Sequence, residues 1–66
     1  MSDNAEIREL VHDLNNVMTR ILTAAELLEG TLPADTEAAT DARNIRSAAL
    51  SGRDLITSIS KQIGSR

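Results

Sequence analysis

The chain has 66 residues, of which 41 % are hydrophobic, and it contains no cysteine, phenylalanine, tyrosine or tryptophan. This length allows one small domain, and the lack of cysteine excludes disulfides and cysteine-ligated zinc. The hydrophobic fraction argues against disorder, and so small a core favours self-association. No apolar run approaches the roughly 18 residues of a membrane span, and no signal pattern begins the chain, so we expect a cytoplasmic protein without a membrane partner.

Charge is divided unevenly along the chain. Residues 1–41 carry nine acidic and two basic side chains, whereas residues 42–66 carry one acidic and five basic side chains. This complementarity suits two segments that fold back on each other in antiparallel fashion. The net charge of −3 and the lack of aromatic side chains for base stacking argue against nucleic acid as a partner.

The first predicted element is a helix over about residues 4–29. Asp3 and Glu6 form a capping-box pattern at its start, and Gly30 follows its last apolar residue as a helix-ending glycine does. Steps of three and four separate the apolar residues, which predicts a helix with a packed seam. These residues are Ile7, Leu10, Val11, Leu14, Val17, Met18, Ile21, Ala24, Ala25 and Leu28.

A turn over about residues 30–34 separates this helix from a second one, over about residues 35–63. Pro33 suits a first helical position, and Asp35 or Thr36 are alternative caps. Small residues around Gly52 allow another helix to approach closely. The second apolar stripe follows a heptad register, widened by Ala48 and Leu55: Ala38, Ala42, Ile45, Ala49, Gly52, Ile56, Ile59 and Ile63.

The predicted fold class is therefore all-α. Residues 1–66 form one antiparallel helical hairpin. A single hairpin cannot enclose its own stripe, because each seam has only one neighbouring helix. Two hairpins side by side enclose it, so we expect a homodimer that forms a four-helix bundle.

His12 is the single histidine. At about 100° per residue it points away from the apolar stripe, so we expect it to be exposed. Considered alone, such a histidine is a solvated surface side chain. It cannot complete a closed metal site, and no nucleophile elbow supports hydrolysis. Its outer face also carries Arg8, Asn16, Thr19 and Thr23, with Asp13 and Arg20 to one flank.

The sequence around this histidine resembles a known motif. The word His12-Asp13-Leu14-Asn15-Asn16 precedes an aliphatic stretch and Ala24-Ala25-Glu26-Leu27-Leu28. This is similar to the H-box of bacterial sensor histidine kinases, in the subgroup reading H-D-[LF]-N-N. The second helix, from Ala38 to Ile63, resembles the A-x-x-A-x-x-x-G/A-x-x-L-[IT] pattern of the same family. The resemblance covers nearly the whole chain, as a dimerisation and histidine-phosphotransfer (DHp) domain of the HisKA type.

The resemblance implies a two-component phosphorelay module. His12 would carry a phosphoryl group and exchange it with the aspartate of a response-regulator receiver domain, which would supply Mg²⁺. Asp13 carries over as the acid that orients the ring, and Asn16 as a residue that positions water for receiver dephosphorylation. Without the motif, Asp13 would be a surface acid near Glu9, and Asn16 a polar surface residue.

The same resemblance suggests where a receiver would dock. On the first helix the expected surface comprises Asn15, Thr19, Arg20 and Thr23, although Asn15 also suits a structural role at the helix flank. On the second helix it lies near Leu55 and Arg53. If the turn centres near residue 32 or 33, position 12 lies opposite position 53, give or take a turn. Arg53 would then screen a phosphohistidine or a receiver's acidic pocket, or else merely balance Glu9 and Asp13.

Two departures from the family pattern affect these expectations. Val17 stands where the commonest H-box has proline, so we expect a straighter first helix without a proline hinge. No ATP-binding domain or cofactor motif is present, so we expect no autokinase activity from this chain alone. It would be loaded by a separate histidine kinase or by a receiver, or it is a fragment of a longer kinase.

Two other readings remain open. In the first, the hairpin is a non-catalytic adaptor or inhibitor that binds a histidine kinase or a receiver through the same bundle. In the second, it is a helical hairpin with no specific role.

Overall fold

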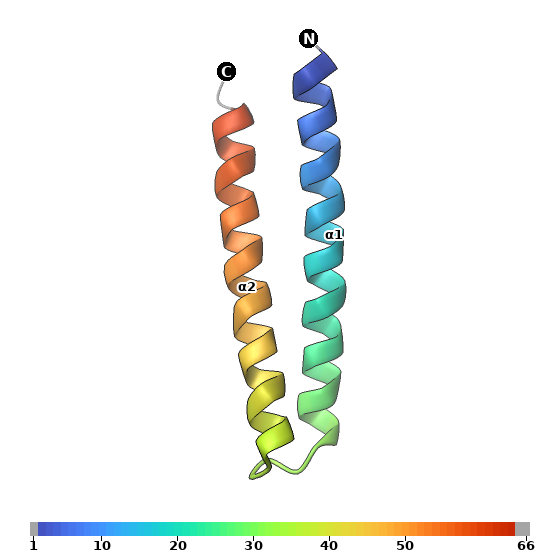
Figure 1. Cartoon of the computed structure of the whole chain (residues 1–66), viewed down its shortest axis with the longest axis vertical. Coiled ribbons are helices and arrows are strands. Elements are labelled where there is room, and N and C mark those ends of the chain that lie inside the picture. The colour runs from blue at the N-terminus through green and yellow to red at the C-terminus, as the bar shows by residue number, and fades with distance from the viewer. Residues whose placement is uncertain (1, 65–66) are drawn as a thin grey trace.

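The structure is a computed structural model that describes residues 2–64, and the side chains of residues 5–63. It consists of two helices, α1 (Ser2–Thr31) and α2 (Glu37–Gly64). The helices run antiparallel and the two ends of the chain lie at the same end of the molecule (Figure 1). The predicted all-α class and helical hairpin are confirmed. In the described part of the chain, neither helix is long and apolar enough to span a membrane.

The first helix continues through Gly30, so the prediction that this glycine ends it was wrong. Gly30 does not adopt a positive φ. The Thr31 hydroxyl donates to the Leu27 carbonyl at 2.8 Å, and the Leu32 N–H donates to the Leu28 carbonyl at 2.9 Å. These bonds occupy carbonyls of the last turn, which would otherwise lack partners.

The connection spans residues 32–36, and Thr36 caps the second helix, which begins at Glu37 rather than at Pro33. The Thr36 side chain accepts a hydrogen bond from the Ala39 N–H at 3.2 Å, as an N-cap threonine does. The Thr36 hydroxyl also donates to the Pro33 carbonyl at 2.8 Å. Of the two alternative caps predicted, Asp35 and Thr36, the structure has Thr36, whereas Pro33 lies in the connection, outside the helix. Asp3, the predicted cap of the first helix, is the second residue of α1, and its side chain lies outside the described side chains.

The core of the hairpin is narrow and made mostly of alanine. Its buried side chains lie toward the loop and the middle of the molecule, where the backbones approach closely. An ion pair extends this contact, since Arg46 Nε donates to Glu29 Oε2 at 2.8 Å. Among the described residues the buried side chains are Leu22, Ala25, Ala39, Ala42, Ala49 and Ile56.

Each predicted apolar stripe divides into two rows. On α1, the row facing α2 contains Val11, Met18 and Ala25 of the predicted stripe, all buried or half-buried, together with the buried Leu22, which the prediction left out. The other row stays exposed although it has heptad spacing. We call it, together with Ile45, Leu55 and Ile59 of α2, the outer apolar face. Its members on α1 are Ile7, Leu10, Leu14, Val17, Ile21 and Leu28, which are 37–62 % exposed.

A contact near the middle of the hairpin shows which residues of the two helices lie opposite each other. A Cβ atom added at Gly52 would lie only 2.8 Å from the Met18 sulfur, so these two residues face each other. Toward the chain termini the ribbons move apart (Figure 1). There Arg8, Val11, Ser60 and Ile63 line an open groove of about 220 Å³.

Candidate functional site

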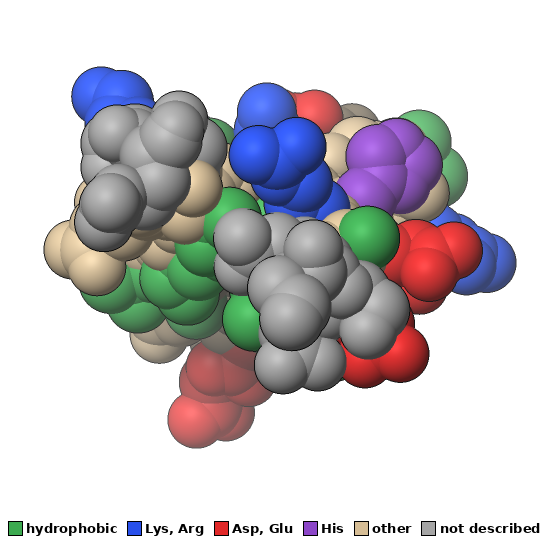
Figure 2. Space-filling view, turned by 90° about the horizontal axis from the view of Figure 1, so that it is seen from above, with side chains coloured by type: hydrophobic (Ala, Val, Ile, Leu, Met, Phe, Trp, Pro, Cys, Tyr) green, Lys and Arg blue, Asp and Glu red, His purple; other side chains and the backbone are tan. Residues whose placement is uncertain are grey.

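His12 lies on α1 in the half of the hairpin that bears the chain termini, and its side chain is exposed. Within residues 2–64 the imidazole has no hydrogen bond or ion pair. In Figure 2, seen from the terminal end, the purple histidine is visible at the surface, away from the green hydrophobic group at the lower left. An incoming protein domain therefore has direct access to the ring.

The α-helix determines which side chains neighbour this imidazole. Residues four apart lie on the same face with Cβ atoms about 5–6 Å apart. Arg8 and Asn16 occupy these positions, one turn before and one turn after His12. No break interrupts α1 at Val17, as the absence of proline predicts. Arg8 was placed on this face by the sequence but had no role assigned to it, although its i, i+4 spacing to His12 was the available signal.

Asp13 does not lie beside His12. Consecutive residues of an α-helix differ by about 100°, so the carboxylate leaves the helix on another side. Neither His12 nor Asp13 has a hydrogen-bond partner in the described part of the chain. An Asp13 bond to the ring N–H thus requires a side-chain rearrangement.

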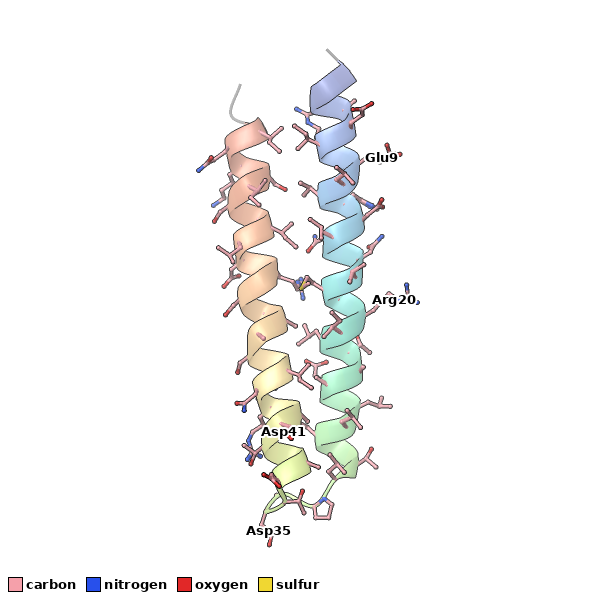
Figure 3. All side chains as sticks on the ribbon, viewed as in Figure 1. Glu9, Arg20, Asp35 and Asp41 are labelled. Atoms are coloured by element: carbon pink, nitrogen blue, oxygen red, sulfur yellow. The ribbon has the colours of Figure 1, made fainter. Side chains whose placement is uncertain are left out.

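The residues expected to form the docking surface on α1 are all exposed. Thr19 and Thr23 continue the His12 face toward the loop, because they follow it by two and three turns. Asn15 lies closer to α2. Arg20, like Glu9, projects from α1 away from α2 (Figure 3). The four residues therefore follow a curved strip of α1 rather than one straight row.

The two residues expected on α2 lie on different sides of that helix. Leu55 is 66 % exposed and precedes Ile59 by four residues, so it belongs to the outer apolar face. Arg53 is half-buried and follows Gly52, so it lies at the level of Met18 along the hairpin. The structure does not bring Leu55 and His12 to one face.

The predicted position of Arg53 opposite His12 needs a correction. The groove pairs Val11 with Ser60, and Met18 meets Gly52, so the counterpart of position 12 lies near residue 59. Arg53 is therefore displaced by six residues, or about 9 Å along the helix axis. The reason is the longer first helix: the hairpin turns around residues 34–35 rather than 32–33.

Electrostatic interactions within the hairpin concentrate near the loop. The hydrogen bond that Arg46 donates to Glu29, followed by the negative charge of Glu29, raises the pKa of Arg46 above its ordinary value. Arg43 Nη2 donates to the Thr40 hydroxyl at 3.2 Å. Both of these contacts lie in the loop half of the molecule. The described residues include no group of three histidine, cysteine, aspartate or glutamate residues able to hold a metal ion.

This arrangement supplies an accessible nitrogen nucleophile, an amide one turn away and a guanidinium on the other side. A neutral imidazole can attack phosphorus in line, provided that the donor approaches along the exposed face. No family model, curated protein or solved structure matches the chain.

Proposed function

We propose that this hairpin is a phosphotransfer module of a two-component system, in which His12 exchanges a phosphoryl group with the aspartate of a response-regulator receiver domain. The single observation that carries the proposal is the exposure of His12, within an H-D-L-N-N word, on the side of the hairpin away from its outer apolar face. His12 therefore remains accessible when a second protein chain covers the outer apolar face.

The chemistry is a reversible exchange between an acyl phosphate and a ring nitrogen. The lone pair of the unprotonated nitrogen of His12 attacks phosphorus, the bond from phosphorus to the receiver's aspartyl oxygen breaks, and its electron pair leaves on the carboxylate. The ring's other nitrogen then releases its proton. Mg²⁺ held by the receiver offsets the charge of the transferring group. Asp13 is the proposed acceptor of that proton, or of a hydrogen bond from it, once its side chain turns toward the ring.

The exposed surface area supports self-association. The chain exposes 5094 Å², whereas a compact monomer of 7.1 kDa exposes about 4100 Å². The excess of roughly 1000 Å² exceeds the ~800 Å² that each partner buries in a standard interface. The shape agrees, because the radius of gyration is 15.2 Å against about 11 Å for a globular chain of this length.

The occupant that best fits the outer apolar face is a second copy of this hairpin. The exposed rows on α1 and α2 repeat at heptad spacing, which is the pattern of a four-helix-bundle seam. A homodimer through this face leaves both copies of His12 outside the bundle. The receiver then meets the opposite side, where Thr19, Thr23 and the basic side chains of α2 lie.

The phosphoryl donor in this proposal is a histidine kinase or a phosphorylated receiver. Exchange with receiver domains would take place in the cytoplasm, which is the proposed location.

The direct test is phosphotransfer from a receiver loaded with radiolabelled phosphate. We expect acid-labile label to appear on the hairpin and to be absent from His12→Gln, with circular dichroism showing that the variant keeps its helices. Label that persists in His12→Gln would refute the assignment of His12.

A second function is favoured by the same outer apolar face. It would also accept the helical hairpin of a histidine kinase, which would make this chain an adaptor or inhibitor. In that case His12→Ala would leave regulation of the partner intact. Under the phosphotransfer proposal the same variant abolishes it.

A further inference from the structure

We infer that Arg8 is a positioning residue that binds the phosphoryl group carried by His12. The inference rests on the proposed function, and it assigns a role to a side chain that the family resemblance leaves without one. Arg53, the cation expected near His12, instead follows Gly52, the residue that meets Met18, and so lies at a different level of the hairpin. Arg8 is the basic residue one helical turn from the imidazole.

Helix geometry brings Arg8 and a phosphorylated His12 within reach. Side chains lean toward the N-terminus of their helix, so the imidazole extends over the turn that contains Arg8. A phosphoryl group on the ring then lies within the range of a long, flexible guanidinium. Within the described residues Arg8 makes no ion pair, in contrast to Arg46, so its guanidinium is available.

The groove between the helix ends provides a support for the Arg8 stem. Val11 and Ile63 form its apolar lining together with Ser60 and Arg8 itself. Methylene groups of arginine rest against apolar surface while the charged end stays in water. The side chain loses part of its freedom in this way, which reduces the entropy lost when the guanidinium pairs with an anion.

The local charge favours such a pairing. Phosphorylation adds a group of about −1.5 to −2 charges, and Glu9, three residues before His12, is a neighbouring carboxylate on α1. This carboxylate would repel the phosphoryl oxygens. Arg8 opposes this repulsion and offers two N–H donors to two phosphoryl oxygens, which is the usual geometry of arginine with phosphate.

The influence of Arg8 on the phosphoryl group can be measured without a kinase or a receiver. Phosphoramidate serves as the phosphoryl donor to His12. The unprotonated ring nitrogen attacks phosphorus, the bond from phosphorus to ammonia breaks, and ammonia leaves with that electron pair and takes up the proton released by the ring. Phosphorus NMR then follows both the loading rate and the protonation of the phosphoryl group as pH changes.

We expect Arg8→Gln to load about two- to fivefold more slowly than the native chain, the size of an exposed charge pair. The midpoint of its phosphorus titration should move to higher pH, because the guanidinium no longer favours the dianion. Arg8→Lys should retain part of the native loading rate and show a smaller shift of the titration midpoint than Arg8→Gln. The matched control is Arg43→Gln, which removes the same charge near the loop and should behave like the native protein.

Equal rates and equal midpoints in Arg8→Gln and the native chain would overturn the inference. So would an Arg43→Gln variant as impaired as Arg8→Gln, since the effect would then follow net charge. A His12 that cannot be loaded at all would contradict both proposals. Normal loading with the Arg8 dependence, but no transfer to any receiver, would contradict only the proposed function.

Discussion

Asp13 and Asn16 relate to His12 in different ways, although both belong to the same five-residue word. Asp13 leaves the helix about 100° away from the imidazole, whereas Asn16 lies on its face one turn later. A water molecule held by the Asn16 amide would meet a receiver that docks on His12. The geometry therefore supports the role proposed for Asn16 more directly than the one proposed for Asp13.

Replacing Asn16 by alanine should separate two reactions. We expect the rate of receiver dephosphorylation to fall about tenfold or more, because the attacking water loses its orientation. Phosphoryl exchange with His12 should be nearly unchanged. Both rates can be read from the decay of a labelled receiver, with Asn44→Ala on the exposed surface of α2 as the control. An equal loss of both reactions would point to impaired docking instead.

The two described glycines inside helices differ in their surroundings. Gly30 has no heavy atom within 4 Å of an added Cβ, while at Gly52 the Met18 sulfur is only 2.8 Å away. Neither glycine has a positive φ, so helix propensity alone would favour alanine at both. The expected effect of an alanine substitution therefore differs between the two positions because only Gly52 contacts the other helix.

Gly30→Ala should raise the free energy of unfolding by about 0.5–1 kcal/mol, since alanine loses less backbone entropy in a helix and meets no neighbour. Urea denaturation at a fixed protein concentration would measure this gain. A loss of stability would mean that the last turn of α1 needs glycine.

Gly52→Ala should gain less, because Met18 must move to make room. The gain of about 1 kcal/mol from helix propensity should appear more fully when Met18 is also alanine. A double-mutant cycle between the two positions should give a coupling of at least ~0.5 kcal/mol. Strict additivity would show that Met18 moves aside without cost.

At the scale of the whole molecule, the hairpin is too thin to bury its apolar residues. Its extents of 51 × 15 × 12 Å leave six described side chains buried and a full heptad row exposed. Self-association through this row removes it from water and adds the core that the hairpin lacks. Stability and oligomeric state should consequently depend on each other.

Ile21→Glu should dissociate the proposed dimer. A carboxylate in the centre of the outer apolar face would lose its hydration in the interface, so we expect the dissociation constant to rise about a hundredfold or more. Leu27→Glu is the control, because Leu27 is 71 % exposed and lies off this row. Sedimentation measurements over a range of concentrations would compare them. A native chain that is monomeric at high concentration would refute the dimer.

Several features could be predicted because they depend on neighbours along the chain. The helical segments follow from the spacing of apolar residues, and the Thr36 cap from a hydroxyl placed just before a helix. The side on which His12 lies follows from the same spacing. The end of α1 was mispredicted, since glycine favours helix ends but does not require them, and the bonds at Thr31 and Leu32 extend the helix.

Two amphipathic helices, a short connection and a histidine opposite an apolar stripe follow from residue spacing, because the 3.6-residue period fixes each side chain on one side of its own helix. The alignment of the two helices depends instead on contacts between residues far apart in the chain. Met18 meets Gly52 because the connection turns later and small side chains allow close approach there. That contact moves Arg53 away from His12 and leaves one row of each apolar stripe exposed, since one neighbouring helix covers only the other row.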